Sequence, residues 1–117
     1  MRFVVATHSR EVKTALFLAL NAVPTIAIVA TATSTADLIS YCRAFLPDIA
    51  VVESGLPGRP LTEVLRQLSD SAPPGRIFVI GEDGASELAR DVGGAEVLRD
   101  VDHLVATLPE LKLEEER

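Results

Sequence analysis

The stretch that most constrains the fold is Pro47–Gly58, which reads PDIAVVESGLPG. Four apolar residues, Ile49–Val52, run without interruption and end at a carboxylate, Glu53, after which Ser, Gly and Pro residues form a turn-prone cluster. This pattern is typical of a strand buried on both faces, as in parallel sheets covered by helices on both sides. Because ligand sites in such sheets lie just beyond the carboxyl ends of the strands, Glu53 is predicted at the functional edge.

Apolar runs and amphipathic segments alternate along the rest of the chain. Strands are predicted at Arg2–Ala6, Thr25–Ala30, Asp48–Glu53, Ile77–Ile80 and Ala95–Leu98. Helices are predicted at Arg10–Ala22, Ala36–Leu46, Leu61–Leu68, Ala85–Val92 and Val101–Leu108. This alternation favours right-handed βαβ units and an α/β, flavodoxin-like fold: a doubly wound five-stranded parallel sheet in the order 2-1-3-4-5, with helices on both faces. Residues 1–113 are expected to form a single domain, followed by a charged end at 114–117.

The charge and the cysteine content restrict the classes of partner. The chain has 117 residues and a formal net charge of −6, which argues against binding to nucleic acid or to an anionic membrane surface, since both require clustered Lys and Arg. Cys42 is the single cysteine and cannot form an internal disulfide, so a reducing, cytoplasmic location is expected. Cys42 falls on the apolar face of its predicted helix and is expected in the core.

The segment around Leu56-Pro57-Gly58 resembles the receiver domain of two-component response regulators, the CheY-like family. In that family the third strand ends at a phosphoacceptor Asp, and a Met-Pro-Gly or Leu-Pro-Gly turn and an amphipathic helix follow it. The turn matches here, Glu63 opens a matching helix, and Gly93 suits the family's Gly before the last strand. The resemblance covers nearly the whole chain and implies the CheY-like form of the predicted fold.

The residues that carry the chemistry of the family are replaced in this chain. The two acidic positions that hold Mg²⁺ correspond to Ala6 and Thr7, and the phosphoacceptor position is Glu53. The three switch positions, which are a hydroxyl residue, an aromatic residue and a Lys in the family, are Gly81, Val97 and Asp100. Mg²⁺ requires several oxygen ligands, and a transferring phosphoryl group requires cationic or hydrogen-bonding groups around its oxygens. The resemblance therefore implies a degenerate pseudo-receiver that is not an enzyme and uses no cofactor and no metal.

The function implied by the resemblance is a phosphorylation-independent signalling module that binds a protein partner, a second copy of itself, or both. By analogy of position with the family, the interaction face would consist of Ala85, Leu88, Val92, Val97, Val101, Leu104 and Val105. Glu53 would be a structural or solvated group near Arg99, and the alternative is a fixed charge that mimics a phosphorylated Asp.

Two other functions remain open from the residues. One is a flavodoxin-like domain that binds a small molecule or nucleotide at the carboxyl edge of the sheet. The other is a hydrolase that uses His8 with the loop hydroxyls of Ser9 and Ser54, although Ser9 is also explained as the N-cap of the first helix. Four acids, Glu53, Glu82, Asp83 and Asp100, are predicted at this edge, where ordinary loop positions are favoured over a cation site because no Ca²⁺-loop spacing is present.

Overall fold

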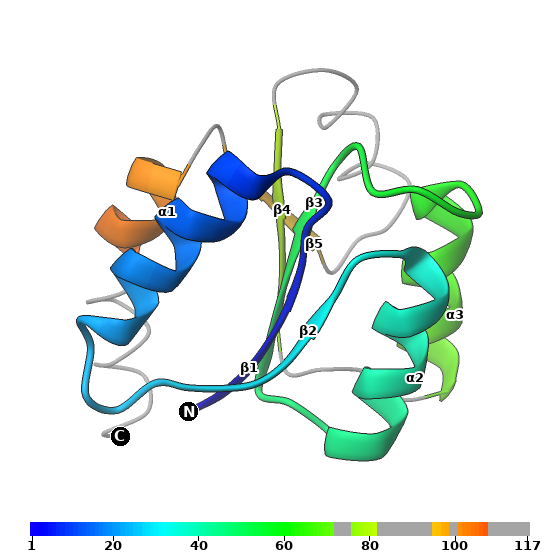
Figure 1. The fold of residues 1–117 in the computed structure, drawn as a ribbon. Helices are drawn as coiled ribbons and strands as arrows, with labels where there is room; N and C mark the ends of the chain where they lie inside the picture. Colours follow the sequence, from blue (N-terminus) through cyan, green and yellow to red (C-terminus); the bar gives the residue numbers. More distant parts are fainter. Residues whose placement is uncertain (72–75, 82–94, 99–100, 108–117) are drawn as a thin grey trace.

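The computed structural model describes residues 1–71, 76–81, 95–98 and 101–107. These residues include a five-stranded parallel sheet in the order β2-β1-β3-β4-β5, which confirms the predicted fold (Figure 1). The elements are β1 Arg2–Ala6, α1 Arg10–Asn21, β2 Ala27–Ala32, α2 Thr35–Phe45, β3 Ile49–Glu53, α3 Leu61–Ser71, β4 Arg76–Ile80 and β5 Ala95–Leu98, with a further helix over 101–107.

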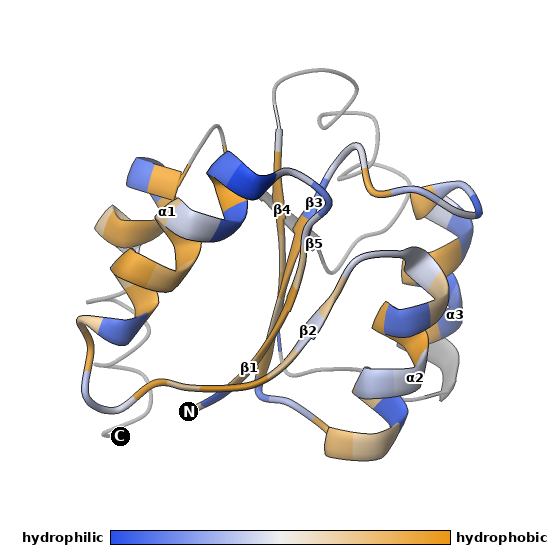
Figure 2. Cartoon of the chain, viewed as in Figure 1, coloured by the Kyte–Doolittle hydropathy of each residue, from blue (hydrophilic) through white to orange (hydrophobic). Residues whose placement is uncertain are grey.

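The sheet separates two layers of helices, and each layer has its own apolar core. Helix α1 and the helix over 101–107 cover one face, while α2 and α3 cover the other (Figure 1). Successive side chains of β1 alternate between them: Val4 packs toward α2 and α3, and Val5 packs toward α1. The central strands are accordingly apolar along their length, as Figure 2 shows.

Strand β2 begins two residues later than the sequence suggests. The Ala27 N–H donates to the carbonyl of Met1, and the strand continues through Ala32, which pairs with Ala6. The start of β2 is therefore set by its hydrogen bonds to β1 and to Met1, and not by the β-branched residues of the segment. The apolar run also predicts that Ile28 is buried, but because β2 is an edge strand Ile28 is only partly buried.

Two of the helices begin at serine caps. The Ser9 hydroxyl accepts from the Val12 N–H at 3.5 Å, which confirms the predicted N-cap of α1. Helix α2 runs one residue ahead of the predicted range, because Ser34 caps it by accepting from the Asp37 N–H at 3.3 Å and Leu46 ends it in the left-handed conformation.

The turn after β3 is tied to the start of α2. The Thr35 hydroxyl accepts from the Arg59 N–H, and the Thr35 N–H donates to the carbonyl of Pro57. Gly58 has a φ of +125°, and a Cβ at this position would lie 2.0 Å from the Thr35 hydroxyl oxygen. The glycine of the Leu-Pro-Gly turn is therefore required by both backbone conformation and space.

Several predictions concern parts of the chain outside the described residues. These are the helix Ala85–Val92, with the proposed face residues Ala85, Leu88 and Val92, the loop residues Glu82, Asp83, Arg99 and Asp100, and the charged end at 114–117. Among the residues that the structure describes, no helix has the length and apolar character needed to cross a membrane.

Candidate functional site

The site is formed where β1 and β3 end side by side. Ala6, the last residue of β1, is in register with Val52, so Thr7 and Glu53 follow at neighbouring positions of the sheet edge. The short β1–α1 loop, Thr7–Ser9, passes directly over this point before the Ser9 cap starts α1. Parallel register thus brings together residues that are 46 positions apart in the sequence.

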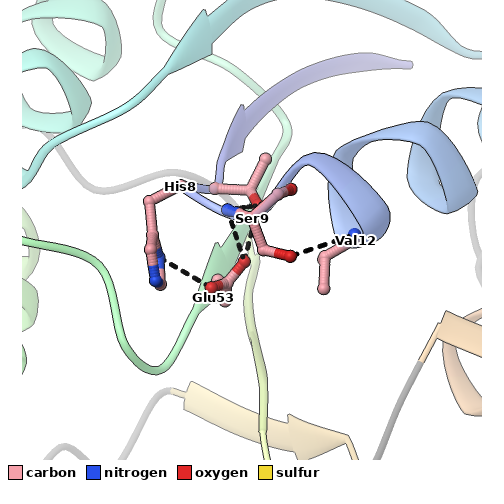
Figure 3. Close-up of polar contacts among 5 residues, drawn as sticks. His8, Ser9, Val12 and Glu53 are labelled. Carbon is pink, nitrogen blue, oxygen red and sulfur yellow. Dashed lines mark hydrogen bonds and ion pairs between the residues drawn. The ribbon is translucent and has the colours of Figure 1, made fainter.

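Three donors from the β1–α1 loop converge on the Glu53 carboxylate (Figure 3). The Thr7 hydroxyl donates to Oε1 at 2.6 Å, and the Ser9 N–H donates to the same oxygen at 3.4 Å. The Nδ1 of His8 lies 2.7 Å from Oε2. Since a carboxylate is an acceptor, Nδ1 carries the proton that lies between His8 and Oε2. We call these four residues the Glu53 network.

The Glu53 network is largely shielded from water. The Glu53 side chain is 11% exposed and Thr7 is 2% exposed, whereas the His8 side chain is 44% exposed. Of the two roles predicted for Glu53, structural or solvated, the structure agrees with the structural one, because protein donors replace water around its carboxylate. Sequence reasoning considered His8 only as a base for a nucleophile, although its place directly after β1 put it at the same edge as Glu53.

A second contact at this edge involves Ser54 and Gly81. The Ser54 N–H donates to the carbonyl of Ile80 at 2.9 Å, which brings the residue after β3 against the end of β4. Gly81 has a φ of +156°, and a Cβ there would lie 1.9 Å from the Ser54 hydroxyl oxygen. The hydroxyl of Ser54 thus occupies the position of a Cβ atom at residue 81.

The structure also tests the hydrolase interpretation. A His with an orienting carboxylate is the arrangement of a general base, and His8 with Glu53 has it. However, the Ser9 hydroxyl caps α1, and within the described parts of the chain no hydroxyl donates to His8. A search of the same residues finds no group of three His, Cys, Asp or Glu side chains placed to hold a metal ion.

The predicted interaction face is described only in part. The backbone of Val97 pairs with Val79 in the sheet. Val101 is half-buried against the core, and Val105 is 43% exposed. Leu104 is fully buried in the core that α1 shares, so its assignment to the face was wrong: the spacing of these residues points Leu104 toward the sheet.

Comparisons with known proteins give matches among solved structures alone, since no family model and no curated protein matches the sequence. The response regulatory domain of mrkE from Klebsiella pneumoniae superposes with a TM-score of 0.83, at 14% identity, with all of both chains covered. The non-phosphorylated receiver domain of the stress response regulator RcsB from Escherichia coli gives 0.80 at 13% identity, covering 100% of this chain and 95% of that one. The receiver domain of the putative response regulator NarL from Mycobacterium tuberculosis gives 0.78 at 19% identity, covering 94% of each chain.

Proposed function

We propose that this chain, which has the CheY-like receiver fold, is a signalling module of the response-regulator type that binds a protein partner without accepting a phosphoryl group. The fold is shared with solved receiver domains over nearly the whole length of the chain. The proposal on phosphorylation comes from the site, because fold alone does not determine function.

The observation that carries the proposal is the closed Glu53 network. Both carboxylate oxygens at the phosphoacceptor position already accept hydrogen bonds from Thr7, His8 and the Ser9 backbone. Mg²⁺ needs oxygen ligands in near-octahedral geometry, and the groups around Glu53 are donors that would have to leave first. The residues at the two acidic positions, Ala6 and Thr7, offer no carboxylate to take their place.

The switching parts of a receiver are also replaced in the described residues. A side chain at Gly81 is excluded by the Ser54 hydroxyl, so the family's mobile hydroxyl has no room at that position. The carboxylate of Glu53 belongs to the chain itself and is held by the side chains of Thr7 and His8. A fixed charge with no two-state element to bias does not switch a conformation. We therefore favour a domain with one conformation over the phosphomimic alternative.

Partner binding is assigned to the helix over 101–107 by its position in the fold. Val105 is 43% exposed there, an apolar side chain at an outward position of a helix whose inner face carries the buried Leu104. A second copy of the chain and a different protein are both compatible with this contact. Ala44, an exposed residue on α2 across the sheet, offers a matched control position.

The experiment is capture of the partner from extract of the native cells, followed by affinity measurements with the purified pair. We expect the Kd for the partner to be the same with and without acetyl phosphate and Mg²⁺. Val105→Asp should weaken the affinity for the partner by about tenfold or more, and Ala44→Asp should change it little. Light scattering over a concentration series tests the homodimer in the same variants. A Kd that shifts severalfold on addition of acetyl phosphate contradicts the proposal.

A further inference from the structure

A cleft of about 450 Å³ adjoins the Glu53 network on its β2 side. It is lined by one side of α1, by the loop Thr7–Ser9, and by Thr33 just after β2. Glu53 does not line it. The cleft thus shares the loop Thr7–Ser9 with the Glu53 network but not Glu53 itself. Its volume falls within the range of about 300–1,000 Å³ in which pockets bind small organic ligands.

The wall formed by α1 carries two cations. Arg10, Lys13, Thr14 and Phe17 line the cleft, and their spacing of three and four residues places them on one side of the helix. Among the described residues that line the cleft none is a carboxylate, and Glu11 of the same helix turn is not one of them. The described residues that line the cleft therefore carry a net positive charge, in a chain whose net charge is −6.

The geometry of the helix adds to this positive potential. Arg10 is the first residue of the 12-residue helix α1, so the cleft opens on the positive end of the helix dipole. Thr14 on α1 and Thr33 just after β2 are hydroxyl-bearing residues that also line the cleft. Arg offers a planar fork of donors to phosphate oxygens, and Lys offers a point charge.

The far part of the same wall is apolar. Phe17 lines the cleft one turn beyond Lys13, and the Nζ of Lys13 lies 5.8 Å from the centroid of the Phe17 ring. A ligand with a charged end near Arg10 and an apolar body near Phe17 would meet complementary groups along its whole length. A bare ion would leave the Phe17 end of the cleft unfilled.

We infer that this cleft binds a small phosphate ester with an aromatic or apolar body, for which a nucleoside monophosphate is the simplest probe. Arg10 and Lys13 bind the phosphate, the Thr14 and Thr33 hydroxyls donate to its oxygens, and Phe17 contacts the body. The inference stands on the cleft alone and does not depend on whether the domain accepts a phosphoryl group at Glu53.

The test is calorimetric titration of the full chain with AMP, ribose 5-phosphate, adenosine and inorganic phosphate. We expect AMP to bind most tightly, the two smaller phosphates to bind more weakly, and adenosine to bind weakest. Arg10→Gln and Lys13→Gln should each weaken AMP binding by about tenfold, which corresponds to one hydrogen bond to a charged group. Higher salt should also weaken it.

Arg66→Gln is the matched control, since Arg66 is an exposed cation on α3, across the sheet from the cleft, and its loss changes the net charge by the same amount. It should bind AMP as the unmodified chain does, and thermal unfolding without ligand verifies that all three variants fold. The inference is overturned if the chain does not bind AMP at millimolar concentration. It is also overturned if all three variants bind AMP with equal affinity. The inference is also overturned if adenosine or inorganic phosphate binds as tightly as AMP.

Discussion

The Nδ1 of His8 lies 2.7 Å from the Oε2 of Glu53, which joins the β1–α1 loop to the end of β3. In the receiver fold this strand end is the phosphoacceptor position. Here its carboxylate accepts hydrogen bonds from His8, Thr7 and the Ser9 N–H and is shielded from water by them. The carboxylate at the end of β3 thus has at least one protein donor on each of its two oxygens.

Thr7→Val tests the contribution of the Glu53 network to stability. The change keeps the shape of the side chain but removes the hydroxyl that donates to Oε1 at 2.6 Å. Because Glu53 is only 11% exposed, water replaces this bond poorly, and the free energy of unfolding should fall by about 1–3 kcal/mol. Urea unfolding measures it, with Thr7→Ser as the control that keeps the hydroxyl. Equal stability of Thr7→Val and the unmodified chain would show that the network contributes nothing.

Gly81→Ala tests the contact between the ends of β3 and β4. The new Cβ would lie 1.9 Å from the Ser54 hydroxyl oxygen, and the φ of +156° is unfavourable for any residue with a side chain. We expect a loss of about 1–3 kcal/mol in the free energy of unfolding. Adding Ser54→Gly should recover the share of this loss in stability that the steric clash causes. The share caused by the unfavourable backbone conformation should remain. A Gly81→Ala variant of unchanged stability would contradict the assigned packing.

Cys42 gives a prediction for alkaline pH. Burial raises the pKa of the Cys42 thiol from 9.0 to about 11, and the side chain has no exposed surface. Below pH 9 the thiol is protonated in both the folded and the unfolded chain, so its contribution to stability is intact. Between pH 9 and 11 the unfolded chain loses the proton first, which favours unfolding by on the order of 2 kcal/mol.

The measurement is the free energy of unfolding of the unmodified chain and of Cys42→Ala across this pH range. The variant should be less stable at neutral pH because of the cavity it leaves, but its stability should fall less steeply between pH 9 and 11. Parallel pH profiles for the two proteins would show that the Cys42 thiol titrates normally in the folded chain.

Much of the fold was predictable from the sequence, because the strands buried on both faces have continuous apolar runs. Ile49–Val52 is such a run and fixed β3 at the centre of the sheet. The edge strand β2 lacks this signal: its boundary depends on the hydrogen bond from Ala27 to Met1, which no local pattern encodes. Leu104 was assigned to a surface by analogy, whereas it lies three residues after Val101 and packs on the same core, with Val105 outside that core.

The location of the candidate site was also predictable, but its contacts were not. Parallel topology places Thr7, His8 and Glu53 at one edge, since they follow neighbouring strands. Which of them touch depends on side-chain reach and on the exact path of the β1–α1 loop, and the sequence carries no pattern for either. The Ser54–Gly81 contact depends on a φ of +156°, which a glycine permits but does not dictate.

Intact-mass spectrometry after incubation with acetyl phosphate and Mg²⁺ is the most direct measurement of the central claim. A receiver domain that keeps the acidic pocket serves as the positive control and should gain one phosphoryl group. For this chain we predict no gain, because Glu53 is held by Thr7 and His8 and has no carboxylate at position 6 or 7 to help it bind the metal. A stoichiometric gain of one phosphoryl group that maps to Glu53, and that is lost in Glu53→Gln, would contradict the account.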